Sequence, residues 1–246
     1  MSDAMIWYLI KFFSEEAHAD QFIAGNLYLN RLSYFKRIEE EFGDGRPDAT
    51  EAVAMWWQPD DFSMTLTVPG IGEVTITKAD LAALVSMAYE HHDYLHIFCL
   101  YAVHTSGFSC VDGKIDYAPE EAEKLHNQLR IDERCFKFGK FAVITPAVPF
   151  LSQLKDALQR QGYRCQGKLV KYYDDEVFHG EIKLEDIPFS KQKRFSYQRE
   201  FRLCVHPKTK DDSPITINMG DISSICAKVE SSRLNGLFSL GVETTQ

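Results

Sequence analysis

The sequence lacks the short motifs that mark several large enzyme classes. It contains no Gly-x-Gly-x-x-Gly, no Gly-x4-Gly-Lys-Ser/Thr, no Gly-x-Ser-x-Gly and no His-Glu-x-x-His. Dehydrogenase, P-loop NTPase, α/β-hydrolase and zincin functions therefore have no support. Internal repeats, low-complexity tracts and a composition shift that would mark a linker are also missing.

Long apolar runs are missing too. None approaches the ~20 residues that span a bilayer. The apolar start at residues 5–10 is interrupted by Lys11, follows no basic region and shows no small-residue cleavage site. We therefore expect a first strand there, not a signal peptide, and a cytoplasmic protein with no membrane partner.

The cysteines show no paired spacing. There is no Cys-x-x-Cys, and several cysteines lie inside apolar segments. This pattern predicts free thiols in a reducing compartment, not a disulfide framework or a zinc site. The six residues are Cys99, Cys110, Cys135, Cys165, Cys204 and Cys226.

Positive charge is scarce overall but concentrated in one stretch. Lys and Arg number 27 against 36 Asp and Glu, which gives a net charge of −9. A nucleic acid would therefore need a local basic patch. Residues 191–202 provide one, with aromatic residues between the charges. Protection of an edge strand by lysines is an equally good interpretation. The basic residues are Lys191, Lys193, Arg194, Arg199 and Arg202, and Tyr197 lies among them.

The order of the expected elements indicates an α+β fold with mixed or antiparallel sheets. Helices fall early and in the middle of the chain, whereas strands crowd the second half, unlike an alternating βαβ protein. We expect one domain over residues 1–246, with residues 56–93 as an insertion. Within it, a hairpin is expected around residues 69–72 and a helix over about 77–89, where apolar residues keep a helical period.

The most informative stretch is FSYQREFRLCV at residues 195–205. Aromatic and branched residues predict a strand, in which Gln198, Glu200 and Arg202 share one face. A carboxylate between an amide and a guanidinium is one arrangement of a catalytic site. The water-facing side of an outer strand, with charged cross-strand pairs, is the interpretation that residue types alone favour.

Other charged residues suggest further alternatives. Arg31 shares a face with apolar residues of an expected strand at 26–32, so it needs an anionic partner, either a carboxylate or a ligand phosphate. Asp44, Asp48 and Glu51 would serve a metal-dependent hydrolase, but their spacing fits no calcium loop. The histidines around residues 91–96 fit zinc only if one helix ran through them. No metal is therefore expected.

Two segments carry a resemblance to a known group. The N-terminal one contains GNLYL at residues 25–29, followed by aromatic residues, Gly-Asp-Gly-Arg-x-Asp and a glutamate. The C-terminal one is YQREFRL at residues 197–203. Together they resemble a group of bacterial and phage proteins, mostly uncharacterised, which is similar to ADP-ribosyltransferases. The resemblance covers about the first fifth and the last quarter of the chain.

The resemblance implies a fold and a chemistry. Glu200 would be the catalytic glutamate, with Gln198 as the first residue of the Gln/Glu-x-Glu motif. Arg31 would bind NAD, and Thr105 and Ser106 would stand for the Ser-Thr-Ser element. NAD would be the substrate, and the basic stretch would receive a nucleic acid or protein acceptor, as in a phage or bacterial conflict factor. The carboxylate would stabilise an oxocarbenium-like state. A non-catalytic binding or inhibitory module on the same fold is the alternative.

Overall fold

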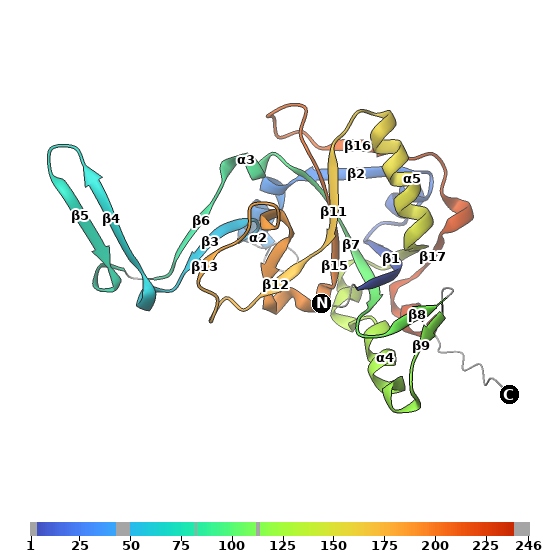
Figure 1. Cartoon of the computed structure of the whole chain (residues 1–246). Coiled ribbons are helices and arrows are strands. Elements are labelled where there is room, and N and C mark those ends of the chain that lie inside the picture. The colour runs from blue at the N-terminus through green and yellow to red at the C-terminus, as the bar shows by residue number, and fades with distance from the viewer. Residues whose placement is uncertain (1–3, 43–49, 82, 112–113, 239–246) are drawn as a thin grey trace.

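A computed structural model describes residues 4–42, 50–81, 83–111 and 114–238 (Figure 1). It is an α+β protein built on one large sheet, in which all strand pairs of the described chain are antiparallel. The strands of that sheet, in spatial order, are β11 (Cys165–Leu169), β15 (Glu200–Val205), β7 (His96–Thr105), β1 (Met5–Phe13), β10 (Phe141–Pro146) and β17 (Ala227–Glu230). Two further strands of the sheet, β2 (Asn26–Arg31) and β16 (Ile215–Asn218), pair with each other, and β2 also pairs with β7.

The remaining strands form small sheets, and the helices are few. The small sheets contain β3 (Val53–Trp57), β4 (Ser63–Val68), β5 (Gly72–Thr77), β6 (Val85–Ala88), β8 (Ser109–Val111), β9 (Lys114–Asp116), β12 (Lys171–Tyr173), β13 (Gly180–Glu181) and β14 (Ser190–Gln192). The α-helices are α1 (Glu16–Ile23), α2 (Leu32–Phe42), α3 (Glu90–Asp93), α4 (Ala122–Leu129) and α5 (Ala147–Arg160). No helix of the described chain is long and apolar enough to cross a membrane.

Strand β7 is the centre of the large sheet. It reads HIFCLYAVHT, an almost unbroken run of apolar residues, as expected for a strand buried on both faces. One edge pairs with β15, from His96 opposite Val205 to Tyr101 opposite Glu200. The other edge pairs with β1 over its second half and with β2 at its start. The pairings on both edges are antiparallel. The first and last thirds of the chain therefore meet on this strand.

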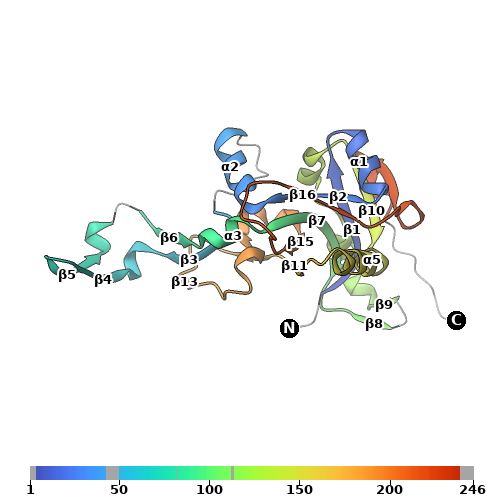
Figure 2. The same cartoon turned by 90° about the horizontal axis from the view of Figure 1, so that it is seen from above.

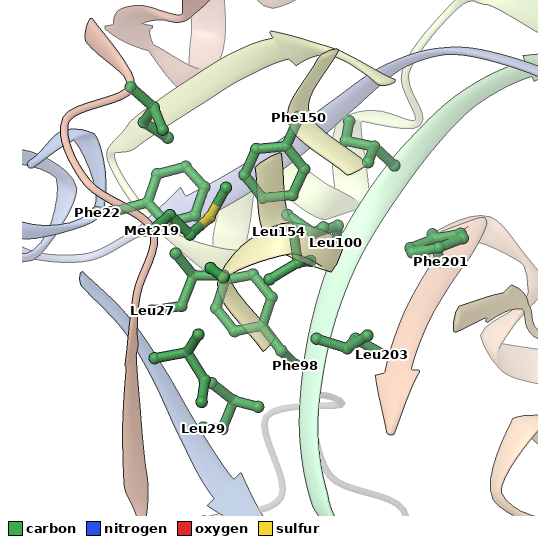
Figure 3. Close-up of a cluster of buried hydrophobic side chains, with 14 of the residues drawn as sticks. Phe22, Leu27, Leu29, Phe98, Leu100, Phe150, Leu154, Phe201, Leu203 and Met219 are labelled. Atoms are coloured by element: carbon green, nitrogen blue, oxygen red, sulfur yellow. The ribbon is translucent and has the colours of Figure 1, made fainter. Parts of the chain in front are cut away.

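One face of the large sheet packs on α1 and α5. Leu27, Leu29, Phe98, Leu203 and Phe201 project from the strands toward Phe22 of α1 and Phe150 and Leu154 of α5 (Figure 3). The Phe22 ring stacks on Phe98 with 5.9 Å between ring centroids. The alternation predicted for residues 201–205 is confirmed, since these apolar side chains occupy one face of β15.

The opposite face of the sheet carries two smaller apolar clusters. One gathers around Ile10, Tyr101 and Val103, and the other around Ile97, Cys204 and Phe189. Because residues directly opposite in an antiparallel pair project to the same side, Glu200 and Arg202 belong to this face as well. The side chains of Glu200 and Arg202 therefore project from the same face as these two apolar clusters.

Two expected elements are wrong. The helix expected over residues 77–89 is a short 3-10 turn at Lys78–Asp80 followed by strand β6, which pairs with β3. The strand expected from residue 195 begins only at Glu200, because Lys193–Gln198 forms 3-10 turns. Gln198 consequently does not lie on the strand face that carries Glu200.

Residues 57–89 leave the body of the molecule as an arm (Figures 1 and 2). Its base is the three-stranded sheet β13-β3-β6, and its end is the two-stranded ribbon β4–β5. The hairpin expected around residues 69–72 is the turn of this ribbon. The arm lies within residues 56–93, for which an insertion stays a prediction.

Candidate functional site

The most unusual feature of the interior is a group of four charged side chains, Glu51, Lys191, Glu200 and Arg202, which we call the buried charge cluster. Each is at most 5% exposed. The Arg202 guanidinium donates to both Glu51 oxygens, at 2.7 and 2.9 Å, and its Nε donates to Glu200 Oε1 at 2.6 Å. Lys191 Nζ lies 3.1 Å from Glu51 and 3.3 Å from Glu200. Two carboxylates and two cations thus contact one another in a closed group.

The cluster is electrically neutral, and each member holds its neighbours in the charged form. Burial alone would raise the pKa of Glu200, but Arg202 and then Lys191 outweigh it, and the pKa falls well below its usual value. The pKa of Glu51 is lowered by the same two cations. Burial would lower the pKa of Lys191, yet Glu51 and Glu200 raise it above its ordinary value.

Remaining polar groups of the cluster also have partners. Arg202 donates a further hydrogen bond to the Pro188 carbonyl at 2.8 Å, and Lys191 donates to Gln198 Oε1 at 2.9 Å. Cys99 lies beside the carboxylates, and burial followed by the charge of Glu200 raises its pKa to about 12, so it stays a neutral thiol. All six cysteines are free thiols, as predicted.

Backbone strain accompanies both glutamates. Among the described residues, only Ala52 and Arg199 have a positive φ without being glycine, at 54° and 39°. Ala52 directly follows Glu51, and Arg199 directly precedes Glu200. Such conformations cost of order 1–3 kcal/mol and persist where the surroundings fix them or where a site requires them. Here the ion pairs of Glu51 and Glu200 with Arg202 and Lys191 hold the backbone next to Ala52 and Arg199 in place.

A pocket of about 330 Å³ opens beside Glu200. It lies where the end of β7, the end of α4 and the segment between β11 and β12 meet. Tyr172 forms part of its wall, and its hydroxyl accepts a hydrogen bond of 3.0 Å from the Glu200 amide. The lining residues are His104, Ser106, Gln128, Leu169, Val170, Tyr172, Ser196, Arg199 and Glu200.

Arg199 connects this pocket to two others. It also lines two hollows of about 520 and 570 Å³, both of which include Asn127 of α4. Its guanidinium donates to the backbone carbonyls of Gln128 and His104, and it meets no carboxylate within the described chain. Burial, followed by the nearby charge of Arg199, lowers the pKa of His104. The positive charge of Arg199 is therefore not neutralised at the pocket wall.

Arg31 is not part of this site. Its guanidinium donates to Asp211 at 3.0 Å and to the Tyr94 and Thr209 carbonyls, so the expected anionic partner is a carboxylate of the chain. Arg31 is opposite His96 on β7, whereas Glu200 is opposite Tyr101, roughly 17 Å further along that strand. Cross-strand pairing also puts the two side chains on opposite faces of the sheet.

Thr105 and Ser106, although adjacent in sequence, lie in different environments. The Thr105 hydroxyl is buried and accepts a hydrogen bond of 3.0 Å from the Trp7 indole. Ser106 lines the pocket beside Glu200, where its amide and carbonyl both bond the Gln128 side chain. Of the residues expected to bind NAD, only Ser106 therefore shares a pocket with Glu200.

The basic stretch does not form one continuous surface. Lys191 and Arg202 are interior and unavailable to a macromolecular target. Lys193 and Arg194 are exposed, but Lys193 pairs with Asp174 at 2.8 Å. Tyr197 packs under the Arg134 guanidinium, 4.1 Å from the ring centroid. The charges of this stretch serve mainly internal contacts.

The described residues do not form either of the metal sites considered from the sequence, the acidic one or the histidine one. Glu51 is engaged by Arg202 and Lys191, and Asp44 and Asp48 lie outside the described residues. No group of three or more ligating side chains suitable for a metal ion occurs in the described ranges. Residues 91–96 contain the end of α3 and the start of β7, so no single helix runs through these histidines.

Sequence reasoning missed several site residues. Tyr172, His104 and Gln128 come from three separate segments, and nothing in their local patterns distinguishes them from ordinary core or surface residues. The charged neighbours of Lys191 in the sequence predict a basic surface, whereas the residue is buried. The one available signal was Glu51, a carboxylate directly before the apolar run AVAMWW, where a buried charge requires a partner.

Comparison with protein-family models, characterised proteins and solved structures returned no significant match. The resemblance to ADP-ribosyltransferases therefore remains a hypothesis that rests on the two sequence segments.

Proposed function

We propose that this protein is a binding module for a small anionic ligand of the nucleotide class, held in the pocket beside Glu200. The supporting observation is Arg199, whose positive charge has no carboxylate partner in the described chain and lies at the junction of three pockets. Phosphate groups are the ligands that a guanidinium of this kind prefers. The pocket is at the small end of the range for ligand sites, about 300–1,000 Å³.

The neutrality of the buried charge cluster favours binding over catalysis. A carboxylate that stabilises an oxocarbenium ion must present unbalanced negative charge to the ribose. Glu200 instead contacts Arg202 at 2.6 Å and Lys191 at 3.3 Å, which cancel its field. The cluster acts as internal structure that holds the pocket wall, and Ser106, Ser196, Tyr172 and Gln128 supply hydrogen-bonding groups around the ligand.

Ligand-dependent melting tests this proposal. NAD, ADP-ribose and AMP are added to the full chain at about 100 times their dissociation constants, and a bound ligand is expected to raise Tm by roughly 5–10 °C. Arg199→Ala should weaken binding at least about 10-fold, Arg199→Lys less, and Arg160→Ala on the exposed end of α5 not at all. Absence of a shift with all three ligands would refute the proposal.

A second candidate is the transferase itself, because Ser106 and Glu200 lie in one pocket. On this hypothesis, NAD is consumed and ADP-ribose is transferred to a nucleic acid or protein acceptor. Release of nicotinamide by the wild type, lost in Glu200→Gln when turnover is expressed per folded molecule, would support it. Stabilisation by NAD without nicotinamide release, across a panel of acceptors, would favour the binding module.

A further inference from the structure

A buried histidine faces a buried arginine at the start of the central strand. His96 of β7 and Arg31 of β2 are directly opposite each other in the antiparallel pair, so their side chains project to the same face of the sheet. Each is only 1% exposed. The Nη1 atom of Arg31 lies 3.5 Å from Nδ1 of His96. Because the two side chains belong to paired strands of the large sheet, they stay next to each other while that sheet is intact.

The connection from β15 to β16 closes over this pair. We call residues 207–214 of this connection the strap. Its side chains are all exposed or half-buried, whereas β16, which follows it, pairs along β2 (Figure 1). At the surface, Lys208 of the strap donates to the Gln161 carbonyl at 2.7 Å. Opening of the strap therefore costs polar contacts and little buried apolar area, which is typical of segments that open locally.

The contacts of the strap with the interior are made to the buried pair. The Ser213 carbonyl lies 3.0 Å from Nε2 of His96. The Nη2 atom of Arg31 donates to the Thr209 carbonyl at 3.2 Å and to the Asp211 carboxylate at 3.0 Å. Asp211 also accepts from the Ser213 amide at 2.9 Å, which fixes the turn of the strap above the ring. The strap thus depends on the state of these two side chains.

These contacts determine which nitrogen of His96 carries the hydrogen. A backbone carbonyl can only accept, so Nε2 is the protonated nitrogen and donates to Ser213. The other nitrogen, Nδ1, then presents a lone pair to the guanidinium of Arg31, which is always charged. The contact between the two side chains is attractive only while Nδ1 has no proton.

The charges around the ring leave no room for a second cation. Among the described residues, the charged groups that act on the ring are Arg31 from β2 and Asp211 from the strap. Asp211 is 52% exposed and already neutralises Arg31. Val205 is opposite His96 on β15 and has no charge, and Asp93 of α3 is paired at 2.6 Å with a lysine of α2. A protonated ring would give two buried cations and one half-exposed carboxylate.

We propose that the strap is an acid-released latch: protonation of His96 places a second cation against Arg31, and residues 207–214 detach so that water reaches both side chains. The strap is the element that moves, because β2 and β7 are held in the core whereas the strap buries no side chain of its own. This inference does not depend on the pocket beside Glu200, which lies further along β7 and on the other face of the sheet.

The direction of the pH effect follows from the environment of the ring. Burial lowers the pKa of His96 below its ordinary value of 6.5, and the charge of Arg31 adds to this, against opposing effects of the Ser213 bond and Asp211. The closed strap therefore has its full stability above pH 6.5 and loses stability as pH falls below that value. At pH 5 the open form gains at most about 30-fold, the limit set by a free imidazole.

Hydrogen exchange of the full chain, followed by mass spectrometry from pH 7 to pH 5, tests the latch. The protection factor of residues 207–214, relative to the intrinsic rate at each pH, should fall about 10-fold in the wild type, within the limit that linkage sets. Protection of β7 should not change. His96→Gln keeps a donor for Ser213 and an oxygen for Arg31 without a titrating group, so its strap should stay protected throughout. The matched control, His91→Gln at an exposed position, should behave as the wild type.

A second measurement needs no variant. The imidazole of His96, followed by NMR, should take up its proton over the same pH range in which the strap loses protection. Equal protection of the strap at pH 7 and pH 5 in the wild type would overturn the proposal. Protonation of His96 under a strap that stays closed would overturn it as well, and so would a folded His96→Gln protein whose strap still opens in acid.

Discussion

Arg202 has no exposed surface, and its guanidinium is engaged by two glutamates and one backbone carbonyl. A side chain in this position contributes little net stability compared with a well-packed apolar residue, because its desolvation offsets the attraction. Removal of one partner is a different matter, since it leaves an uncompensated charge in a medium of low dielectric. The cluster is therefore stable as a set and vulnerable at each member.

Glu200→Gln should destabilise the protein strongly. The substitution keeps the shape of the side chain but leaves the cluster with two cations and one carboxylate, which costs about 3–5 kcal/mol for a buried pair. For a chain of this size we expect Tm to fall by roughly 6–20 °C. The control is Glu73→Gln on the exposed ribbon. An unchanged Tm for Glu200→Gln would contradict the structural role of Glu200.

The double substitution Lys191→Met/Glu200→Gln should cost less than the sum of the two single changes. It removes one charge of each sign, so that Glu51 and Arg202 remain as a neutral pair joined by two hydrogen bonds. We expect a coupling energy of about 1–3 kcal/mol. Urea unfolding of the wild type, both single variants and the double variant measures it, and strict additivity would show that the two groups do not interact.

At the scale of elements, the join between α1 and β2 depends on one backbone approach. Gly25 has a φ of 89°, and an added Cβ would lie 1.8 Å from the Gly220 carbonyl oxygen. The amide of Met219 also bonds the Gly25 carbonyl at 2.8 Å. The segment after β16 is thereby held against the turn that starts β2, which pairs with both β16 and β7.

Gly25→Ala should accordingly be much more damaging than Gly70→Ala. Both glycines have a positive φ, 89° and 81°, but nothing lies within 4 Å of a Cβ at Gly70. The backbone term alone costs about 1 kcal/mol, which is the expected effect at Gly70, whereas the clash at Gly25 should add at least about 2 kcal/mol more. Thermal melting of the two variants compares them directly, and equal losses would refute the steric argument.

Elements with strong local patterns could be predicted, and elements decided by distant partners could not. The strand at residues 26–31, the helix that precedes it and the apolar strand β7 follow from alternation, glycine position and an apolar run. Residues 77–89 keep a helical period, yet β3 provides a pairing edge that turns Val85–Ala88 into a strand. For the site, alternation put Glu200 and Arg202 on one face, but no local rule indicates that Glu51 and Lys191 join them.

For the whole molecule, stability should fall steeply in acid. The folded-state pKa values of Glu51 and Glu200 are lowered, so their stabilisation is fully present above the unfolded value of about 4.5 and is lost as pH falls below it. The raised pKa of Lys191 means that its contribution persists up to about pH 10.5 and declines above that value. Urea unfolding from pH 3 to 7 should show this slope, and Glu200→Gln should flatten it. Parallel slopes in both proteins would contradict the assignment.

The position of β7 also has a consequence for synthesis on the ribosome. Glu51 emerges 151 residues before Arg202, its main partner. At about 5–20 residues per second, the nascent chain spends roughly 8–30 s with Glu51 lacking this cation, and roughly 5–20 s of that time with the β15 edge of its central strand unpaired. Over that interval the N-terminal half presents an apolar strand edge, which is the kind of surface that chaperones recognise and that aggregates form on. The last quarter of the chain thus determines when the first half becomes safe from aggregation.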